Sequence, residues 1–160
     1  MKKFCLAILM LTVLVILPST VRAQGGARQT PQVVRDADLE KDSLHNLEVA
    51  RHYFKLRKAY VAALQRCEEI VAGNPTFSRI DEVLLIAGQS SLNLAAGKGK
   101  QSSTLYVVHE GEAKRTLKPE EFRELARDYF SHLVNSYPES AFRVQAEGEL
   151  KALGGAKPKQ

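Results

Sequence analysis

The apolar residues of this chain recur at helical spacing over most of its length. In the segment Ala59–Pro75, residues Ala63, Cys67 and Ile70 are separated by four and three positions, which places them on one face of a helix. Pro75 then ends that helix, because the residue before a proline is disfavoured in the helical conformation. The pattern predicts a helix with a narrow buried face, followed by a turn.

A second segment repeats the same gaps at four positions of its own. They are Ala126, Phe130, Leu133 and Pro138. The small first residue allows a neighbouring helix to approach closely, and the larger residue one turn further on fills the space beyond it. Two copies of one helix and its terminating proline predict helical repeats, which form binding surfaces more often than catalytic sites.

The periodicity predicts an all-α protein of antiparallel helix pairs, stacked as a short solenoid of about five helices. The expected helices and their candidate capping residues are 43–57 with Asp42 or Ser43, 59–73, 79–97 with Ser78, 119–137, and 141–153 with Ser140. A short corner at Arg57-Lys58 joins the first two helices. The third helix is the most apolar, and Gly88 leaves one side of it without a bulky side chain. It should therefore be central, with neighbours on both sides.

Residues 98–118 interrupt this pattern, since the connection within a helix pair is usually only a few residues long. A polar run is followed by the β-prone stretch LYVV, and Gly111 lies just beyond it. The segment predicts a loop or a small hairpin. We expect it to be dispensable for folding, because loop length changes the closure entropy only slowly.

The first 23 residues predict a secretory signal peptide. Lys2 and Lys3 precede a short apolar run, and Val21 and Ala23 stand at the positions that a signal peptidase recognises. The run is short for a membrane span, and an uncleaved anchor is the alternative. Cys5 lies before the apolar run rather than just after it, so no lipidation site is expected. The expected location is the periplasm, with the outer membrane as a candidate place of association.

Four regions follow from these patterns. They are the signal peptide 1–23, a polar and flexible lead-in 24–41, the helical repeat domain 42–155 with its insertion 98–118, and a loose tail 156–160. Removal of the signal peptide leaves 160 − 23 = 137 residues, enough for one domain with a core.

Charge and cysteine content narrow the possible partners. Three of the 23 basic residues and none of the 18 acidic ones leave with the signal peptide, so the remaining charge is 20 − 18 = +2. This balance predicts no nucleic-acid partner. Cys67 is the one cysteine left, so no intramolecular disulfide can form. Its place on the apolar face predicts a core residue, with a reactive thiol as the alternative.

The repeat positions resemble those of tetratricopeptide repeats. The matching positions of the first copy are Leu47, Ala50, Phe54, Tyr60, Ala63, Cys67, Ile70 and Pro75. Cys67 replaces the aromatic residue usual in that family, and Arg51 and Lys58 stand where small residues or glycine are usual. The resemblance covers residues 43–153 without the insertion and implies a helical scaffold.

Within that superfamily, two segments resemble exported groups. Residues 50–75 resemble the branch that contains the outer-membrane assembly lipoprotein BamD, and residues 133–153 resemble the end of the Tol-Pal-associated periplasmic protein YbgF/CpoB. The lipidated cysteine of the BamD-like group is missing, and the chain holds roughly two and a half repeats where that group has about five. The resemblance therefore implies a fold and a scaffold role, without a particular partner.

The residues capable of catalysis form no complete motif. His45 and His52 share a helical face but lack nearby cysteine or acidic ligands for a metal. His109 and Glu110 begin a zinc-protease motif, yet Ala113 takes the place of its second histidine. The adjacent carboxylates are predicted to be solvated faces and helix-end charges; they are Glu68-Glu69 and Glu120-Glu121. We therefore predict no catalytic residue, no cofactor and no metal site. A small envelope hydrolase or metal-dependent enzyme is the competing hypothesis.

A binding surface remains as the expected functional feature. The inner face of stacked helix pairs is lined mainly by the first helix of each pair. The candidate peptide-binding residues on that face are Asn46, Arg51, His52, Lys55, Gln89 and Asn93. Such a set suits an extended or acidic peptide, and maintaining solubility is the alternative role. Arg51 and Lys55 are expected to be exposed, so reversing both charges should change stability by less than about 1 kcal/mol.

The sequence thus predicts a non-catalytic protein–protein interaction scaffold of the bacterial cell envelope. Its expected partners are other envelope proteins or peptides. The first hypothesis is a BamD-like role in outer-membrane protein assembly. The alternative is a YbgF/CpoB-like adaptor associated with Tol-Pal or peptidoglycan.

Overall fold

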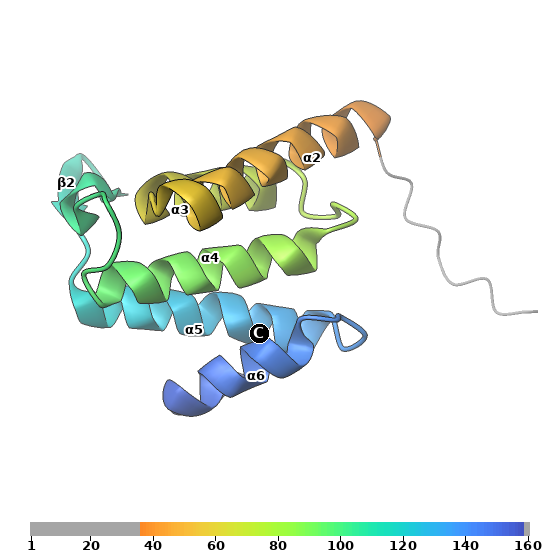
Figure 1. Cartoon of the computed structure of the whole chain (residues 1–160). Coiled ribbons are helices and arrows are strands. Elements are labelled where there is room, and N and C mark those ends of the chain that lie inside the picture. The colour runs from red at the N-terminus through yellow and green to blue at the C-terminus, as the bar shows by residue number, and fades with distance from the viewer. Residues whose placement is uncertain (1–35, 159–160) are drawn as a thin grey trace, which may run out of the picture. The chain divides into compact units, whose positions relative to one another are not determined.

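The computed structural model describes residues 36–158, which form five α-helices and one two-stranded antiparallel sheet (Figure 1). The elements in chain order are α2 (Ala37–Arg51), the π-helix η1 (His52–Arg57), α3 (Tyr60–Gly73), α4 (Ile80–Ala95), the 3-10 helix η2 (Ser103–Leu105), β1 (Val107–Glu110), β2 (Ala113–Thr116), α5 (Pro119–Ser136) and α6 (Arg143–Ala152). The predicted all-α class is confirmed. The predicted signal peptide 1–23 and the lead-in up to residue 35 lie outside the described residues.

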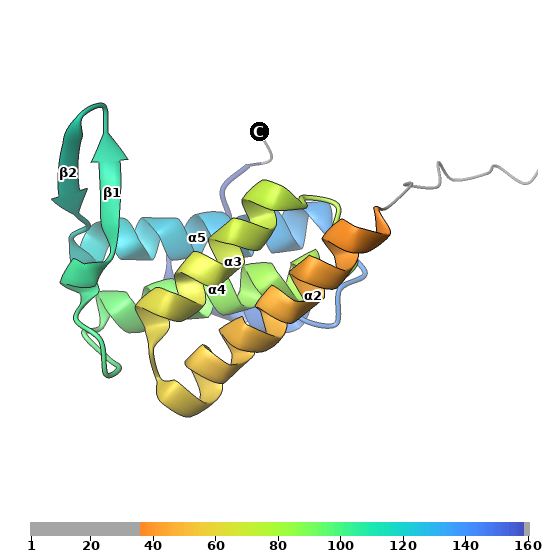
Figure 2. The same ribbon diagram turned by 90° about the horizontal axis from the view of Figure 1, so that it is seen from above.

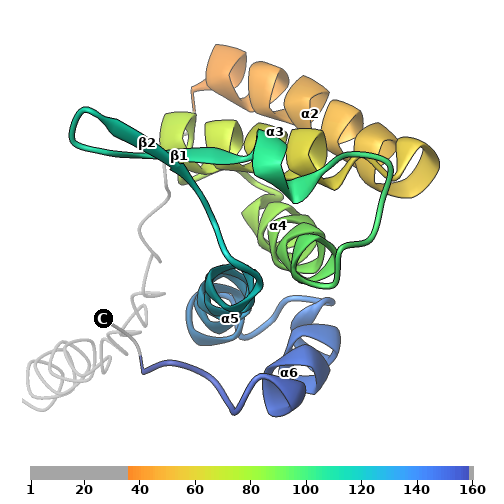
Figure 3. The same cartoon turned by 90° about the vertical axis from the view of Figure 1, so that its left-hand side faces the viewer.

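Successive helices pack against one another in chain order, α2 on α3, α3 on α4, α4 on α5 and α5 on α6. As predicted, α4 lies between two neighbours, α3 and α5, and it is buried along most of its length (Figure 1). The β1–β2 hairpin projects beside the helices near the start of α5 (Figure 2). In the end-on view of Figure 3, α4 lies above α5 and α6 lies below it, and both are displaced to the right of α5.

Both copies of the repeated apolar pattern lie in the core. Ala63 and Cys67 of α3 are fully buried, as are Ala126, Phe130 and Leu133 of α5. The prediction that Cys67 is a core residue is confirmed. Burial raises the pKa of its thiol far above the usual range, which keeps the sulfur protonated and unreactive.

The two small residues of the repeated pattern give a first test of the packing. Ala63→Leu and Ala126→Leu should each lower the free energy of unfolding by about 1–3 kcal/mol, because both residues are fully buried and a longer side chain overpacks a close-packed core. Ala72→Leu is the control, since Ala72 is exposed on α3 and should change stability by less than about 0.5 kcal/mol. Urea unfolding measures all three. Equal midpoints for the buried and exposed variants would contradict the alignment of the two copies.

The first described helix begins earlier than predicted, at Ala37 rather than near residue 43. Asp36 is its N-cap, because Oδ1 of Asp36 accepts hydrogen bonds from the backbone N–H groups of Asp38 at 2.9 Å and Leu39 at 3.2 Å. Ser43 is not a cap but lies within the helix, where its hydroxyl donates to the Leu39 carbonyl at 2.7 Å. The prediction of a flexible lead-in up to residue 41 is therefore wrong for residues 37–41.

The other two serines predicted as caps connect helices instead. The backbone N–H of Ser78 donates to the Glu40 carboxylate at 3.1 Å, which ties the start of α4 to α2. The Ser140 hydroxyl donates to Asp81 Oδ2 at 2.7 Å and accepts from the backbone N–H of Phe142 at 3.1 Å. α6 begins only three residues after Ser140. Each serine is thus bound to a carboxylate of another helix, which a local capping pattern does not predict.

The corner after the first helix lies where it was predicted. The helix ends in the π-helical turn η1, and Lys58 follows with a φ of 54°, in the left-handed region. Glycine is the residue that adopts this conformation most readily, and a lysine there carries a small conformational cost. The repeat pattern also expects glycine or a small residue at this position.

The insertion 98–118 contains the predicted hairpin, in which β1 pairs with β2, but it is packed onto the helices. Tyr106 is only 8% exposed, and the centroid of its ring lies 5.5 Å from that of Phe122 in α5. Gln101 Oε1 accepts a hydrogen bond from the backbone N–H of Ala62 at 3.1 Å, near the start of α3. Because these contacts make the insertion part of the packed structure, we now expect its removal to destabilise the fold.

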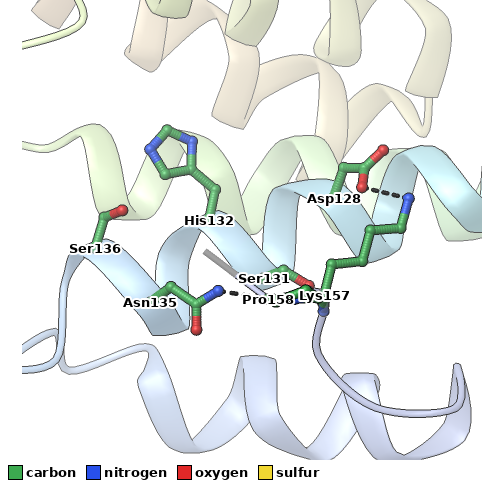
Figure 4. Close-up of a pocket in the computed structure, with 7 residues that line it drawn as sticks. All are labelled: Asp128, Ser131, His132, Asn135, Ser136, Lys157 and Pro158. Atoms are coloured by element: carbon green, nitrogen blue, oxygen red, sulfur yellow. Dashed lines mark hydrogen bonds and ion pairs between the residues drawn. The ribbon is translucent and has the colours of Figure 1, made fainter. Parts of the chain in front are cut away.

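The predicted loose tail, residues 156–160, is bound to α5 over its described part (Figure 4). The backbone N–H of Lys157 donates to the Ser131 hydroxyl at 2.8 Å, and its carbonyl accepts from Asn135 Nδ2 at 2.9 Å. These contacts involve the main chain of the tail. A polar sequence without periodicity gives no sign of them.

Candidate functional site

Three elements, η1, α4 and α6, contribute to one surface hollow of about 250 Å³. Its lining residues are Phe54, Gln89, Leu92, Asn93, Lys98 and Glu149. α4 and α6 both pack against α5, and the hollow brings together residues that are far apart in the sequence. Two of its lining residues, Gln89 and Asn93, belong to the set that the sequence predicted for peptide binding.

The hollow combines apolar side chains with amides. Phe54 and Leu92 are half-buried and supply the apolar part. Asn93 Nδ2 donates to the backbone carbonyl of Gln89 at 2.8 Å, which orients the Asn93 amide and leaves its oxygen available. Among residues 36–158, the side-chain amide of Gln89 has no hydrogen-bond partner. Such a surface can pair with the N–H and C=O groups of an extended peptide.

Two charges of opposite sign stand at this hollow, Lys98 and Glu149. Lys98 follows α4 and is exposed, whereas Glu149 belongs to α6 and is half-buried. Because the two charges offset each other, the hollow selects less strongly for an acidic ligand than the sequence predicted.

Arg51 lies on the predicted face, but its guanidinium is already bound. Its Nε donates to Glu82 Oε1 at 2.6 Å and its Nη2 donates to Glu82 Oε2 at 2.7 Å, a bidentate pair between α2 and α4. Arg79 adds a third contact to Glu82 at 2.7 Å. Burial opposes ionisation of Glu82, but the hydrogen bond and charge of Arg51, aided by Arg79 and Lys55, outweigh it and lower the pKa of Glu82. Arg51 is therefore not a free, exposed side chain as expected but part of a structural ion pair with Glu82.

The other three predicted residues on α2 and η1 have different surroundings. Lys55 and His52 are exposed, and His52 Nε2 accepts a hydrogen bond from Arg57 Nε at 3.3 Å. Asn46 is half-buried on α2. The structure thus brings Gln89 and Asn93 together in the hollow, whereas Asn46, Arg51, His52 and Lys55 are not among its lining residues.

Reversing the charges at Arg51 and Lys55 should now have unequal effects. Arg51→Glu should lower the free energy of unfolding by about 1–3 kcal/mol, because it leaves the Glu82 carboxylate, 12% exposed, beside a second carboxylate. Lys55→Glu should change it by less than about 0.5 kcal/mol, since Lys55 is exposed. Urea unfolding at neutral pH measures both. Equal and small effects would mean that the Arg51–Glu82 pair does not join the helices.

A second cluster of polar side chains lies between α3, α5 and the insertion. Oε1 of Glu68 accepts hydrogen bonds from the hydroxyls of Tyr106 at 2.6 Å and Tyr129 at 3.1 Å. The prediction of a solvated Glu68 is therefore wrong. Burial raises the pKa of Glu68, and the two tyrosine hydrogen bonds reverse only part of that rise. The carboxylate is satisfied by protein groups and supports the packing of the insertion.

The raised pKa of Glu68 predicts a pH-dependent effect of Glu68→Gln. Because the pKa of Glu68 is higher in the folded state, ionising its carboxylate destabilises that state. This destabilisation is absent below the pKa of glutamate in the unfolded chain, about 4.3. It grows as the pH rises towards the folded-state pKa and is complete above it. Glutamine keeps the acceptor oxygen without the charge. The variant should therefore be more stable than the parent at pH 7, and the gain should shrink towards pH 4. Urea unfolding at both values measures it, with exposed Glu69→Gln as the control. A gain independent of pH would contradict this account.

Residues 36–158 contain neither a cluster of metal ligands nor a helix suited to span a membrane. No group of three or more histidine, cysteine, aspartate or glutamate side chains in this range is placed to hold a metal ion. Within the same range, no helix has both the length and the apolar character needed to cross a membrane.

Sequence reasoning missed three of the residues that line the hollow. Leu92 was counted only as part of an apolar helix, while Lys98 and Glu149 come from the start of the insertion and from the last helix. Phe54 was named from the sequence as a repeat position, and it both packs against the core and lines the hollow. Helical spacing from Gln89 could have indicated Leu92, three residues further on, whereas Glu149 depends on how α6 packs.

Comparison with known proteins gives little support for any transfer of function. No protein-family model matches the chain, and no solved structure matches it. Elongation factor 2 of Methanopyrus kandleri is 44% identical over 50 residues, which are 31% of this chain. The match spans about 4% of the elongation factor, and so short a share supports no conclusion about fold or activity.

Proposed function

We propose that this protein is a non-catalytic interaction module of the bacterial cell envelope that binds an extended peptide on the face formed by η1, α4 and α6. The observation that carries the proposal is the hollow of about 250 Å³, where an apolar patch lies beside two side-chain amides. The Gln89 amide, with no partner among the described residues, is the first candidate for a hydrogen bond to peptide backbone.

The proposal includes a tetratricopeptide-like arrangement of the helices. It is supported by the burial of the repeated apolar positions in α3 and α5 and by packing of successive helices in chain order. Arg51 and Glu82 join the first helix of one pair to the first helix of the next, which keeps the binding face in one geometry. A rigid face lowers the entropy cost of binding a peptide.

The envelope location rests on the sequence of residues 1–23. Expression in a bacterial host, followed by mass spectrometry of the periplasmic fraction, tests it. A mature N-terminus at Gln24 supports export with cleavage. Retention of residues 1–23 in the membrane fraction supports the anchor, and accumulation of the full chain in the cytoplasm contradicts an envelope role.

Site-specific photo-crosslinking tests the binding face. A photoreactive residue at Lys98 lies at the hollow, whereas one at Gln145 lies on an exposed part of α6 that does not line it. A partner that crosslinks at 98, does not crosslink at 145, and is lost in Gln89→Ala/Asn93→Ala supports the proposal. Gln65→Ala/Gln145→Ala is the matched control for loss of two exposed amides. Crosslinks that survive the loss of Gln89 and Asn93 place the interface elsewhere.

The identity of the captured partner then separates the two envelope hypotheses. Components of outer-membrane protein assembly would support the BamD-like role, and components of the Tol-Pal system or peptidoglycan would support the YbgF/CpoB-like role. Neither hypothesis requires a catalytic group in the hollow.

A further inference from the structure

The segment that follows α6 returns along α5 and is held there through its main chain (Figure 4). Arg127 Nε donates to the Gly155 carbonyl at 2.7 Å. The Lys157 N–H donates to Ser131 Oγ at 2.8 Å, and Asn135 Nδ2 donates to the Lys157 carbonyl at 2.9 Å. Three side chains of one helix thus bind backbone groups of an extended segment. Because every peptide carries these groups, the contacts do not depend on the sequence of the bound segment.

Selectivity comes from one side chain of the segment. The Lys157 ammonium lies 2.5 Å from Asp128 and 3.0 Å from Glu124. With Ser131 and Asn135, these carboxylates occur at spacings of four, three and four residues, so they follow one face of α5. The face therefore selects a lysine or arginine at this position of an extended segment.

Residues 154–158 of the tail do not fill the surface on which they lie. A hollow of about 440 Å³ lies beside it, lined by Asp128, Ser131, His132, Asn135 and Ser136 of α5 together with Lys157 and Pro158 (Figure 4). The ion pairs that hold the tail are also weak, since Glu124 and Asp128 are 58% and 53% exposed and are well screened by water. A longer segment with the same lysine can make the same contacts and fill the remaining space.

We infer that this face of α5 is a second peptide site, separate from the hollow on α4, which binds an extended segment of another protein that places a lysine or arginine between Glu124 and Asp128. The chain's own tail occupies the site until such a segment displaces it. A tethered occupant competes with a free peptide for the site. The apparent affinity for the free peptide is then the intrinsic affinity multiplied by the fraction of molecules in which the site is open.

The experiment uses the full chain, labelled with ¹⁵N, and the peptide acetyl-Gly-Gly-Ala-Lys-Pro-amide, which has the sequence of residues 154–158. Lys157→Glu places a carboxylate beside Asp128 and Glu124 and should release the tail. The dissociation constant of the peptide should then be at least tenfold lower for Lys157→Glu than for the parent. The shifted amide signals should include those of Ser131 and Asn135.

Two controls make the result specific. The peptide with glutamate in place of lysine should bind to Lys157→Glu more weakly than the lysine peptide, and Glu124→Gln/Asp128→Asn added to that variant should weaken binding of the lysine peptide about fivefold, as two exposed ion pairs allow. Equal affinity for parent and variant, shifts confined to other helices, or no binding to the variant would overturn the inference. A parent dimer that dissociates on Lys157→Glu would also overturn it, because the site would then belong to the tail of a second copy.

Discussion

Gly88→Ala is expected to lower the free energy of unfolding by about 3 kcal/mol, although alanine favours helices over glycine by about 1 kcal/mol. Gly88 lies within α4, where a Cβ would come 2.5, 2.7 and 2.8 Å from Cε1, Cζ and Cδ1 of Phe130. Phe130 is fully buried in α5, so its ring has no free space into which to move. The clash must therefore separate α4 from α5 or distort one of them.

Gly148→Ala is the matched control, because Gly148 also lies within a helix, α6, and an added Cβ meets no atom within 4 Å. That variant should gain about 0.5–1 kcal/mol from helix propensity alone. The combination of Gly88→Ala with Phe130→Leu should recover part of the loss, since the smaller side chain leaves room for the methyl group. Urea unfolding measures each variant. Stabilisation by both alanine substitutions would mean that Gly88 does not contact Phe130.

The contact between Gly88 and Phe130 also explains why much of the fold was predictable. The sequence showed both Gly88, which leaves one side of an apolar helix without a bulky side chain, and Phe130, a large residue at a repeated position of another helix. The structure places the two together. Where burial imposes a period of 3.6 residues, sequence and structure agree. The start of α2 was missed because Asp38, Glu40, Lys41 and Asp42 show no such period, and the helix there begins with a side-chain cap.

The binding face was predictable only in part, because its polar contacts join residues far apart in sequence. Gln89 and Asn93 lie one turn apart on one helix, so their shared face follows from helical geometry. The partner of Arg51 is Glu82, 31 residues away, and which carboxylate a guanidinium meets depends on how two helices cross. The sequence therefore suggested Arg51 as a residue that binds a ligand, whereas its guanidinium binds Glu82 of the same chain.

Glu68 also has partners that are remote in the sequence, since its two tyrosines are 38 and 61 residues away. On its own helix it has the neighbours of an ordinary surface glutamate. One partner, Tyr106, comes from the insertion, where no periodic pattern indicates which side chains are buried. A half-buried carboxylate that joins two hydroxyls is thus a property of the tertiary packing, and it makes the insertion part of the structure.

The insertion can be tested with two changes of very different size. Tyr106→Ala is expected to lower the free energy of unfolding by about 3–5 kcal/mol, because it removes a buried aromatic ring from Phe122 and a hydroxyl from Glu68. Shortening the hairpin should cost less than about 1 kcal/mol. Residues 109–114 are replaced by Asn-Gly, which closes a two-residue turn on the existing Val108–Arg115 pair and retains Tyr106.

Complete replacement of 99–117 by a short Gly/Ser linker should therefore destabilise the protein at least as much as Tyr106→Ala. It removes the same ring and also the Gln101 side chain that accepts the N–H of Ala62. Tyr106→Phe isolates the hydrogen bond to the Glu68 carboxylate and should cost about 1.5–3 kcal/mol. Urea unfolding monitored by circular dichroism ranks the four variants. If the complete replacement unfolded at the same urea concentration as the hairpin variant, Tyr106 would contribute nothing to stability, and the segment would be the dispensable loop that loop entropy alone predicts.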